Sequence, residues 1–371
     1  MKPKRVLYVD FYSFVGGGQQ NLLSVFKAMD RARYTPLLAI PHDGPFGDAA
    51  RALNVPVFIT PMGKARWRLF WQAWPAMLRL RRLMKEQAVD LVHANCYPAN
   101  KIAGPAARPL KIPVLWHKQI AVTQKPGSTT GKLWKHFSRY NARVLAVSKQ
   151  GFEGLAALGV PREKLGLLYN NADTEGLAKA KAATDAMLKA LGIPARRPLI
   201  LAAGMRRPHK GFDTLLKAWP LVKAKGHLLL LGDAADSEPA HEAELKALSK
   251  QARLDVLPAQ RPFAPWLKRA DLFVSSSRWE GSPLVVIEAM AAGTPVLATY
   301  EASGEIMEDR KTGALVHRED VEGLAKALDA VLKTLPAARR RAKAAQRVAQ
   351  RRFSLKGYVK DLAAIYDGML R

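Results

Sequence analysis

Short apolar runs alternate with longer amphipathic stretches along almost the whole chain. Apolar runs bounded by turn residues are typical of buried strands, and the stretches between them are typical of covering helices. This alternation predicts a parallel α/β fold. The predicted strands are Val6–Val9, Leu37–Ile40, Val57–Ile59, Leu91–His93, Val114–Trp116, Val144–Val147, Leu199–Ala202, Leu228–Leu231, Val256–Pro258, Leu272–Ser275, Val296–Ala298 and Gly313–Val316.

The predicted strands form two sets of about six, and residues 171–198 between them carry no strand pattern. A chain of 371 residues is long enough for two domains that each bury a core. We expect Rossmann-like domains over 1–172 and 173–350 and an amphipathic helix over 351–371. Ligands of such sheets bind at the carboxyl ends of the strands, so we expect the chemistry in a cleft between the two domains.

The net charge of +28 favours polyanionic partners such as an anionic membrane, nucleic acid or an acidic substrate. The chain has no zinc spacing, RNA-binding signature or helix-turn-helix pattern, so we expect no specific nucleic acid. Its one cysteine, Cys96, excludes an internal disulfide and favours a reducing compartment. No signal-peptide pattern is visible, and no apolar run approaches the ~20 residues that span a bilayer. We therefore expect a cytoplasmic protein.

Two carboxylates, Glu280 and Glu288, have seven residues between them at a predicted strand–loop–helix junction. Ser282 is the expected N-cap and Pro283 the first helical residue, because proline has no N–H to lose there. The helix should end near Gly293. A helix N-terminus favours phosphate, and carboxylates accept hydrogen bonds from sugar hydroxyls. A sugar linked to a diphosphate would use all of these features.

This arrangement resembles the Glu-x7-Glu motif of the retaining glycosyltransferases of family 4, since Glu-Gly-x-Pro, Glu-Ala-Met-Ala-Ala-Gly and Pro-Val fall in register. The resemblance implies the GT-B fold, with two Rossmann-like domains facing a central cleft and a C-terminal helix crossing back to the N-terminal domain. It implies that Glu288 binds ribose hydroxyls and that Glu280 binds hydroxyls of the transferred sugar. The amides around Ser282, Leu284 and Val285 would hold the diphosphate.

A basic loop, Gly-Met-Arg-Arg-Pro-His-Lys-Gly, follows the predicted strand Leu199–Ala202. It resembles the family loop in which arginine and lysine clamp the donor diphosphate. Lys210 falls on the family lysine, whereas Met205 takes the arginine position and leaves that role to Arg206 or Arg207. Fixed cations stabilise a leaving diphosphate and can replace a divalent metal. Since no Asp-x-Asp pair stands at a strand end, we expect no metal.

The triplet Gly16, Gly17 and Gly18 follows the first strand and precedes a predicted helix at Asn21–Met29. Glycine amides can approach a phosphate or sugar closely. The triplet does not continue as a G-x-G-x-x-G fingerprint, which disfavours a dinucleotide enzyme, and it resembles the family's Gly-Gly loop. His117, at the end of its strand, resembles the family histidine that approaches the transferred sugar.

Other positions carry weaker signals. By position alone, Gln260 and Arg261 should lie near the nucleobase, and His93 and Asn95 are candidate acceptor contacts. Asn170-Asn-Ala-Asp resembles a family turn between the domains, with Asn171 in place of a glycine. After Thr299 the family's glycine pair is missing.

Tryptophans and basic residues coincide in 64–85 and 132–139. This combination suits an anionic headgroup layer, and the alternative is that the aromatic side chains pack on the N-terminal sheet. We expect peripheral binding at the inner face of the cytoplasmic membrane.

The sequence therefore predicts a metal-independent, retaining glycosyltransferase without a cofactor. Its co-substrate would be a nucleotide diphosphate sugar, with a UDP-sugar favoured over a GDP-sugar. Its acceptor would be a glycan or glycolipid in cell-surface polysaccharide or lipopolysaccharide synthesis. One alternative is a GT-B sugar-nucleotide epimerase, which needs no acceptor. Another is a non-enzymatic polyanion or membrane binder, which the charge suggests.

Overall fold

The computed structural model describes the chain except for residues 1, 64–72, 195–197, 235, 236, 253, 255, 259 and 261 and the side chain of Asp233. The chain divides into two compact units. Unit 1 comprises Met1–Asn170 and Leu355–Arg371, and unit 2 comprises Asn171–Ser354. The sequence placed these two boundaries after residues 172 and 350.

In the described part of the chain, unit 1 is built on seven parallel strands in the order β3-β2-β1-β4-β5-β6-β7. The strands are β1 Lys4–Val9, β2 Tyr34–Ile40, β3 Val57–Ile59, β4 Leu91–Ala94, β5 Val114–Lys118, β6 Arg143–Ala146 and β7 Leu165–Leu167. The helices are α1 Gly17–Ala28, α2 Pro45–Ala52, α3 Trp74–Glu86, α4 Tyr97–Ala107, α5 Thr129–Ser138, α6 Lys149–Ala157 and α16 Leu355–Met369, with 3-10 turns at Arg108–Leu110 and Arg162–Lys164. All strands but β7 were predicted. The run Leu-Gly-Leu was missed because it is short and its glycine removes the apolar pattern.

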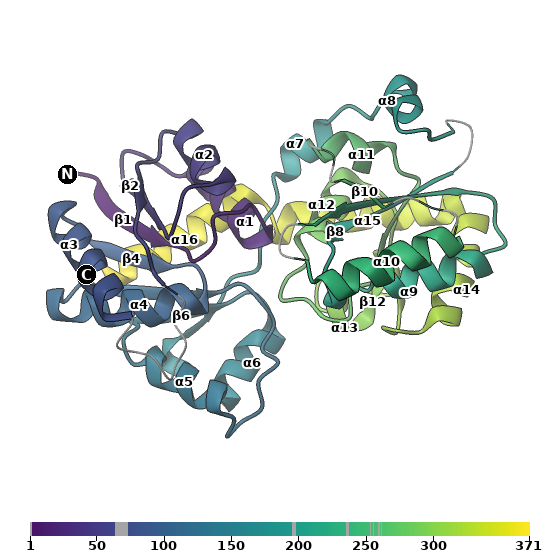
Figure 1. The fold of residues 1–371 in the computed structure, drawn as a ribbon. Helices are drawn as coiled ribbons and strands as arrows, with labels where there is room; N and C mark the ends of the chain where they lie inside the picture. The colour runs from purple at the N-terminus through teal and green to yellow at the C-terminus, as the bar shows by residue number, and fades with distance from the viewer. Residues whose placement is uncertain are drawn as a thin grey trace. The chain divides into compact units, whose positions relative to one another are not determined.

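Side chains of β1 alternate between the two faces of this sheet, as the strand period requires. Val6 and Tyr8 pack in a core layer with side chains of α1 and α16, whereas Leu7 and Val9 pack with side chains of α3 and α4. Helices therefore cover both faces of this sheet, with α1 and α16 on one face and α3 and α4 on the other (Figure 1). A strand buried on both faces explains why the sequence reads as a continuous apolar run.

The C-terminal helix α16 belongs to the core of unit 1, although α15 before it belongs to unit 2. Tyr358 and Tyr366 are buried, and Tyr358 Oη accepts from Asn21 Nδ2 at 3.1 Å. The implied return of the last helix to the N-terminal domain is thus confirmed (Figure 1, yellow). The single helix predicted over 351–371 is wrong. The carbonyl of Phe353 accepts from Ala172 N at 2.9 Å instead of a helical amide, and the helix breaks there.

In the described residues, unit 2 is built on six parallel strands in the order β10-β9-β8-β11-β12-β13. The strands are β8 Leu199–Met205, β9 His227–Asp233, β10 Val256–Pro258, β11 Leu272–Ser275, β12 Val296–Thr299 and β13 Ala314–Val316. The helices are α7 Thr174–Lys179, α8 Asp185–Ala190, α9 Phe212–Ala218, α10 Pro239–Ala252, α11 Ala264–Arg269, α12 Leu284–Ala292, α13 Tyr300–Ser303, α14 Val321–Lys333 and α15 Leu335–Arg352, with 3-10 turns η4 Pro208–Lys210 and η5 Trp219–Leu221. All of these strands were predicted, so the two Rossmann-like α/β domains are confirmed.

Both sheets reverse their strand order beside their first strand. In unit 1, β1 lies between β2 and β4, and in unit 2, β8 lies between β9 and β11. Such a switch point opens a crevice at the carboxyl ends of the strands, where open α/β sheets bind ligands. The loops that follow β1 and β4 in unit 1, and β8 and β11 in unit 2, are therefore the places for functional side chains.

Candidate functional site

In unit 2 the loops after β8 and β11 meet through one ion pair. Lys210 Nζ at the end of η4 lies 2.5 Å from Glu280 Oε1, and the side chains are 14% and 12% exposed. Ser277 Oγ donates to the same carboxylate oxygen at 2.9 Å. The structure thus brings together two residues that the sequence assigned separately to the diphosphate and to the transferred sugar.

Gly211 allows this approach of the two loops. Its φ is 65°, in the left-handed region, and a Cβ there would lie 2.0 Å from the carbonyl oxygen of Ser276. Only glycine fits such a close contact between two backbones. Ser276 Oγ also donates to the carbonyl of Lys210 at 3.2 Å, so a hydrogen bond joins the two loops directly before this glycine.

Helix α12 begins at Leu284 with Pro283 as its N-cap, and it ends at Gly293, whose φ is 77°. The predicted C-terminus is confirmed. The predicted N-terminus, with Ser282 as N-cap, is wrong by one residue, because the carbonyl of Pro283 accepts the first helical bonds from residues 286 and 287. The amides of Leu284 and Val285 precede those bonds, and first-turn amides have no partner within their own helix. Ser282 is buried, whereas Glu288 within α12 is half-buried.

Arg206 lies directly after β8, and its side chain crosses the end of β9. Its Nη1 lies 3.0 Å from Glu242 Oε2 of α10, and its Nε donates to the carbonyl of Gly232 at 3.3 Å. A Cβ at Gly232 would lie 2.8 Å from Arg206 Cγ, so the glycine leaves room for the arginine. In this structure Arg206 pairs with α10, whereas Lys210 pairs with Glu280.

Gln260, half-exposed after the edge strand β10, donates from Nε2 to the carbonyl of Pro258 at 3.2 Å. Arg261 lies outside the described residues. The nucleobase role of this pair therefore stays a prediction.

In unit 1 the glycine triplet forms the start of α1. Gly16 is the N-cap and the helix begins at Gly17, so the prediction that it begins at Asn21 is wrong. The carboxamide of Gln19 accepts from Gly16 N at 3.2 Å and closes the first turn, which allows glycines to be helical there. A Cβ at Gly17 would meet nothing within 4 Å, whereas one at Gly18 would lie 3.3 Å from Gln119 Cγ. No other group of the described residues therefore packs against α1 at Gly17.

His117 lies within β5 and not at its end, and it is 1% exposed. Burial lowers its pKa to about 3, so the ring is neutral. Gln119 Nε2 donates to His117 Nδ1 at 3.2 Å, which assigns the ring proton to Nε2. That nitrogen has no hydrogen-bond partner among the described residues. His117 is therefore placed as a neutral hydrogen-bond donor.

A buried carboxylate that the sequence analysis missed is linked to this histidine by hydrogen bonds through Gln119 and Asn95. Asp10, directly after β1, accepts from Asn95 Nδ2 at 2.7 Å and from Gln19 Nε2 at 3.0 Å. Burial raises its pKa. A signal for Asp10 was present in the sequence, because functional side chains gather at the carboxyl ends of buried parallel strands and Asp10 directly follows β1. Asn95 and His93 are also buried, and His93 Nδ1 lies 2.6 Å from Tyr366 Oη of α16.

Lys118, the last residue of β5, was also missed. It is 2% exposed, and burial lowers its pKa to about 7. Its Nζ donates to the carbonyl of Ile120 at 3.0 Å and lies 4.6 Å from the ring centre of Trp134. This lysine holds the chain that follows the strand.

The expected membrane segments differ in exposure. Residues 64–72 lie outside the described part, but α3 exposes Trp74 (56%) and Leu78 (45%) on one face. In 132–139 the aromatic side chains Trp134 and Phe137 are both 4% exposed. Trp134 packs with core side chains, and the ring of Phe137 lies edge-on to the ring of Tyr97. The prediction that these aromatics face a membrane is wrong, because they complete the core beneath α5.

Two kinds of feature are absent from the described residues. They contain no cluster of three or more His, Cys, Asp or Glu side chains that could hold a metal ion. No helix among them is long and apolar enough to cross a bilayer.

Two family models match the chain. The model described as Glycosyltransferase Family 4 matches residues 15–175, and the model described as Glycosyl transferases group 1 matches residues 197–334. The first match lies mainly in unit 1 and the second within unit 2, and together they include Gly16, His117, Lys210 and Glu280.

The lipopolysaccharide core biosynthesis mannosyltransferase LpsB of Rhizobium meliloti is 28% identical over 242 residues, which are 62% of this chain and 67% of that protein. The UDP-Gal:alpha-D-GlcNAc-diphosphoundecaprenol alpha-1,3-galactosyltransferase of Escherichia coli is 20% identical over 341 residues, 87% of each. Three further curated relatives are 30–35% identical, and the chain spans only 39–45% of their lengths.

Among solved structures, HepE of Anabaena in complex with UDP-glucose has a TM-score of 0.85 at 20% identity. The match covers 98% of this chain and 99% of HepE. At this identity the likeness shows the shared two-domain fold.

Proposed function

This chain belongs to the family-4, group-1 glycosyltransferases, and we propose that it moves a sugar from a nucleotide diphosphate donor to a glycan or glycolipid acceptor. The observation that carries the proposal is the contact between Lys210 and Glu280 in the loop that leads into α12. A lysine, a carboxylate and a following helix N-terminus suit the diphosphate and the hydroxyls of such a donor.

We propose a UDP-sugar as the favoured donor, with a GDP-sugar as the second choice. HepE binds UDP-glucose, and the Escherichia coli relative uses UDP-Gal according to its name. The acceptor we propose belongs to cell-surface polysaccharide or lipopolysaccharide synthesis. LpsB is named for lipopolysaccharide core biosynthesis, and the Escherichia coli relative is named for a lipid-linked sugar, GlcNAc-diphosphoundecaprenol.

We further propose that transfer retains the anomeric configuration and needs no metal. Lys210 would stabilise the charge of the leaving diphosphate together with the α12 amides, and Arg206 would join it after leaving Glu242. Glu288 would bind the ribose and Glu280 the transferred sugar. No residue is assigned as a nucleophile; the leaving phosphate itself would accept the proton of the attacking hydroxyl.

Thermal-shift measurements with UDP, GDP, ADP, TDP and CMP, with and without Mg²⁺, test the donor. A ligand that binds only the folded state raises the melting temperature, so we expect a shift with one diphosphate that does not require Mg²⁺. A product assay with that sugar donor and a glycolipid acceptor separates transfer from epimerisation. No shift with any nucleotide would contradict the proposal.

We propose peripheral attachment to the inner face of the cytoplasmic membrane through α3, whose exposed face carries Trp74 and Leu78 beside Arg79, Arg82 and Lys85. We expect co-sedimentation with anionic vesicles that weakens in high salt and in Trp74→Ala/Leu78→Ala. Leu221→Ala, which removes an equally exposed apolar side chain of unit 2, should bind like the wild type. Equal binding of all three proteins would contradict this attachment.

A further inference from the structure

Arg278 joins the two loops of the unit 2 site. Its backbone N–H donates to the carbonyl of His209 at 2.7 Å, and its Nη1 donates to the carbonyl of Pro208. Both carbonyls belong to η4, the turn that ends in Lys210. Because Glu280 follows Arg278 by two residues, this one residue connects the turn that carries the lysine to the loop that carries the glutamate.

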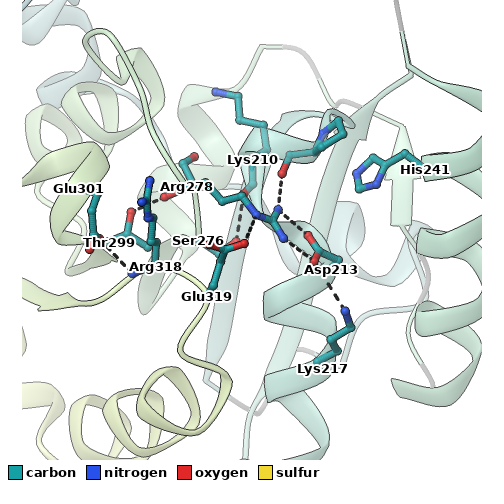
Figure 2. A network of polar contacts seen from close by, with 12 residues as sticks. Lys210, Asp213, Lys217, His241, Ser276, Arg278, Thr299, Glu301, Arg318 and Glu319 are labelled. Carbon is teal, nitrogen blue, oxygen red and sulfur yellow. Dashed lines mark hydrogen bonds and ion pairs between the residues drawn. The ribbon is translucent and has the colours of Figure 1, made fainter. Parts of the chain in front are cut away.

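Two carboxylates fix the guanidinium of Arg278 (Figure 2). Nη1 and Nη2 donate to the two oxygens of Asp213 at 2.9 and 2.7 Å, and Nε donates to Glu319 at 2.8 Å. Asp213 lies in the first turn of α9, and its side chain is 8% exposed. Bidentate pairing of a planar guanidinium with a carboxylate sets direction as well as distance. The side chain is therefore held in one orientation.

The hydrogen bonds of Arg278 leave little for a ligand. The guanidinium has five N–H bonds, and four of them are directed at Asp213, Glu319 and the carbonyl of Pro208. Its positive charge is matched by the two carboxylates. Burial alone raises the pKa of Asp213, but the hydrogen bonds and charge of Arg278 outweigh burial and hold that pKa below its usual range. The pair therefore stays ionised at neutral pH.

An aromatic contact strengthens the same junction. His209 of η4 stacks on Trp279, with ring centres 4.5 Å apart and planes at 19°. Burial lowers the pKa of His209 to about 4, so the stacked ring is neutral. The turn that carries Lys210 and the loop that carries Glu280 are thus also held together by the packing of His209 on Trp279.

We propose that Arg278 is a positioning residue that holds Lys210 and Glu280 in place for the nucleotide diphosphate sugar and is not itself a ligand of the phosphates. The role of Lys210 and Glu280 in donor binding rests on the proposed function, whereas the contacts of Arg278 are observed independently of it. A phosphate ligand needs free N–H groups and uncompensated charge. Arg278 offers one remaining N–H bond, and its charge is already compensated by Asp213 and Glu319.

Hydrogen exchange in the free protein tests the geometry without any ligand. Arg278→Lys keeps a charge for Asp213 but loses the planar fork, so it should fold and yet loosen the junction. We expect amide exchange in residues 209–212 and 279–282 to accelerate by about tenfold, the equivalent of ~1.4 kcal/mol of local opening. The control is Lys217→Met, because the ion pairs of Lys217 are with Asp213 at 3.8 Å and with Glu244 at 3.7 Å, and neither carboxylate belongs to the two loops. Unchanged exchange in Arg278→Lys, or equal acceleration in both variants, would overturn the proposal.

UDP affinity in Asp213→Asn separates positioning from charge. A phosphate-binding Arg278 would gain free charge when Asp213 becomes neutral, and UDP would bind more tightly. A positioning Arg278 would lose its anchor, and we expect about five- to tenfold weaker UDP binding by calorimetry, with Lys217→Met unchanged. Tighter binding would refute the proposal. If the wild type bound no nucleotide at all, the proposed function would fail, while hydrogen exchange would still decide the positioning role.

Discussion

The ammonium of Lys210 lies 2.5 Å from the carboxylate of Glu280, a residue 70 positions later in the chain. Both side chains are largely buried, and a buried pair interacts more strongly than one in water. In the proposed function the lysine binds the diphosphate and the glutamate binds the sugar. This contact therefore couples the two halves of the donor site before any ligand arrives.

Replacing Lys210 by methionine should leave the carboxylate of Glu280 without its cation. We expect the free energy of unfolding to fall by about 2–4 kcal/mol, because a largely buried charge loses its partner. The double variant Lys210→Met/Glu280→Gln should regain most of this stability but no nucleotide-induced thermal shift. Urea unfolding and thermal shift measure the two effects. A wild-type nucleotide shift in Lys210→Met would contradict the assigned role.

Glu288→Ala should raise the donor KM and lower turnover, because hydroxyl contacts of the donor are lost. Hydrogen bonds to a charged group contribute about 1.5–3 kcal/mol, so kcat/KM should fall about 10- to 100-fold. Glu322→Ala is the control, since this glutamate of α14 is 77% exposed in its side chain. Steady-state kinetics with the donor identified by thermal shift provide the measurement, and full activity of Glu288→Ala would refute the ribose assignment.

Alanine substitutions at two glycines with positive φ distinguish the cost of backbone strain from the cost of a steric clash. At Gly192, whose φ is 71°, an added Cβ would meet nothing within 4 Å, whereas at Gly211 it would lie 2.0 Å from the Ser276 carbonyl oxygen. We expect Gly192→Ala to cost about 1 kcal/mol through φ alone. Gly211→Ala should cost about 3 kcal/mol or more, because the loops must also separate. Equal losses in denaturant unfolding would show that the contact at Gly211 relaxes freely.

The buried histidines of unit 1 should make its stability depend on pH. His117 has a folded pKa of about 3 and that of His93 is well below the usual value, both through burial, whereas an unfolded histidine titrates near 6.5. The unfolded chain therefore binds more protons between these values. The stabilisation is full above pH 6.5 and is lost as pH falls toward 3, by up to about 1.4 kcal/mol per pH unit for each histidine.

The control for this effect is His117→Gln, which keeps a polar side chain but does not titrate. Asp10 has a raised pKa and acts in the opposite direction, but it is present in both proteins and cancels from their difference. Urea unfolding at pH 7, 6 and 5 should give a steeper loss for the wild type. Parallel curves would mean that folding does not lower the pKa of His117.

The strands followed from the sequence because local patterns determine them. Val256–Pro258 and Leu272–Ser275 have the predicted bounds, since apolar runs between polar residues leave one register for burial. Helix starts were less accurate. The start of α1 depends on the Gln19 side chain closing a glycine turn, and that of α12 depends on which carbonyl accepts the first helical bond.

Periodicity and motif spacing are local properties, and they were enough to predict the two-domain α/β fold, the family and the loops in which the candidate residues lie. They could not predict that Lys210 pairs with Glu280, that Arg278 pairs with Asp213 or that Trp134 lies in the core. These three outcomes became visible only in the folded chain, because charge pairing and burial depend on neighbours that are remote in the sequence.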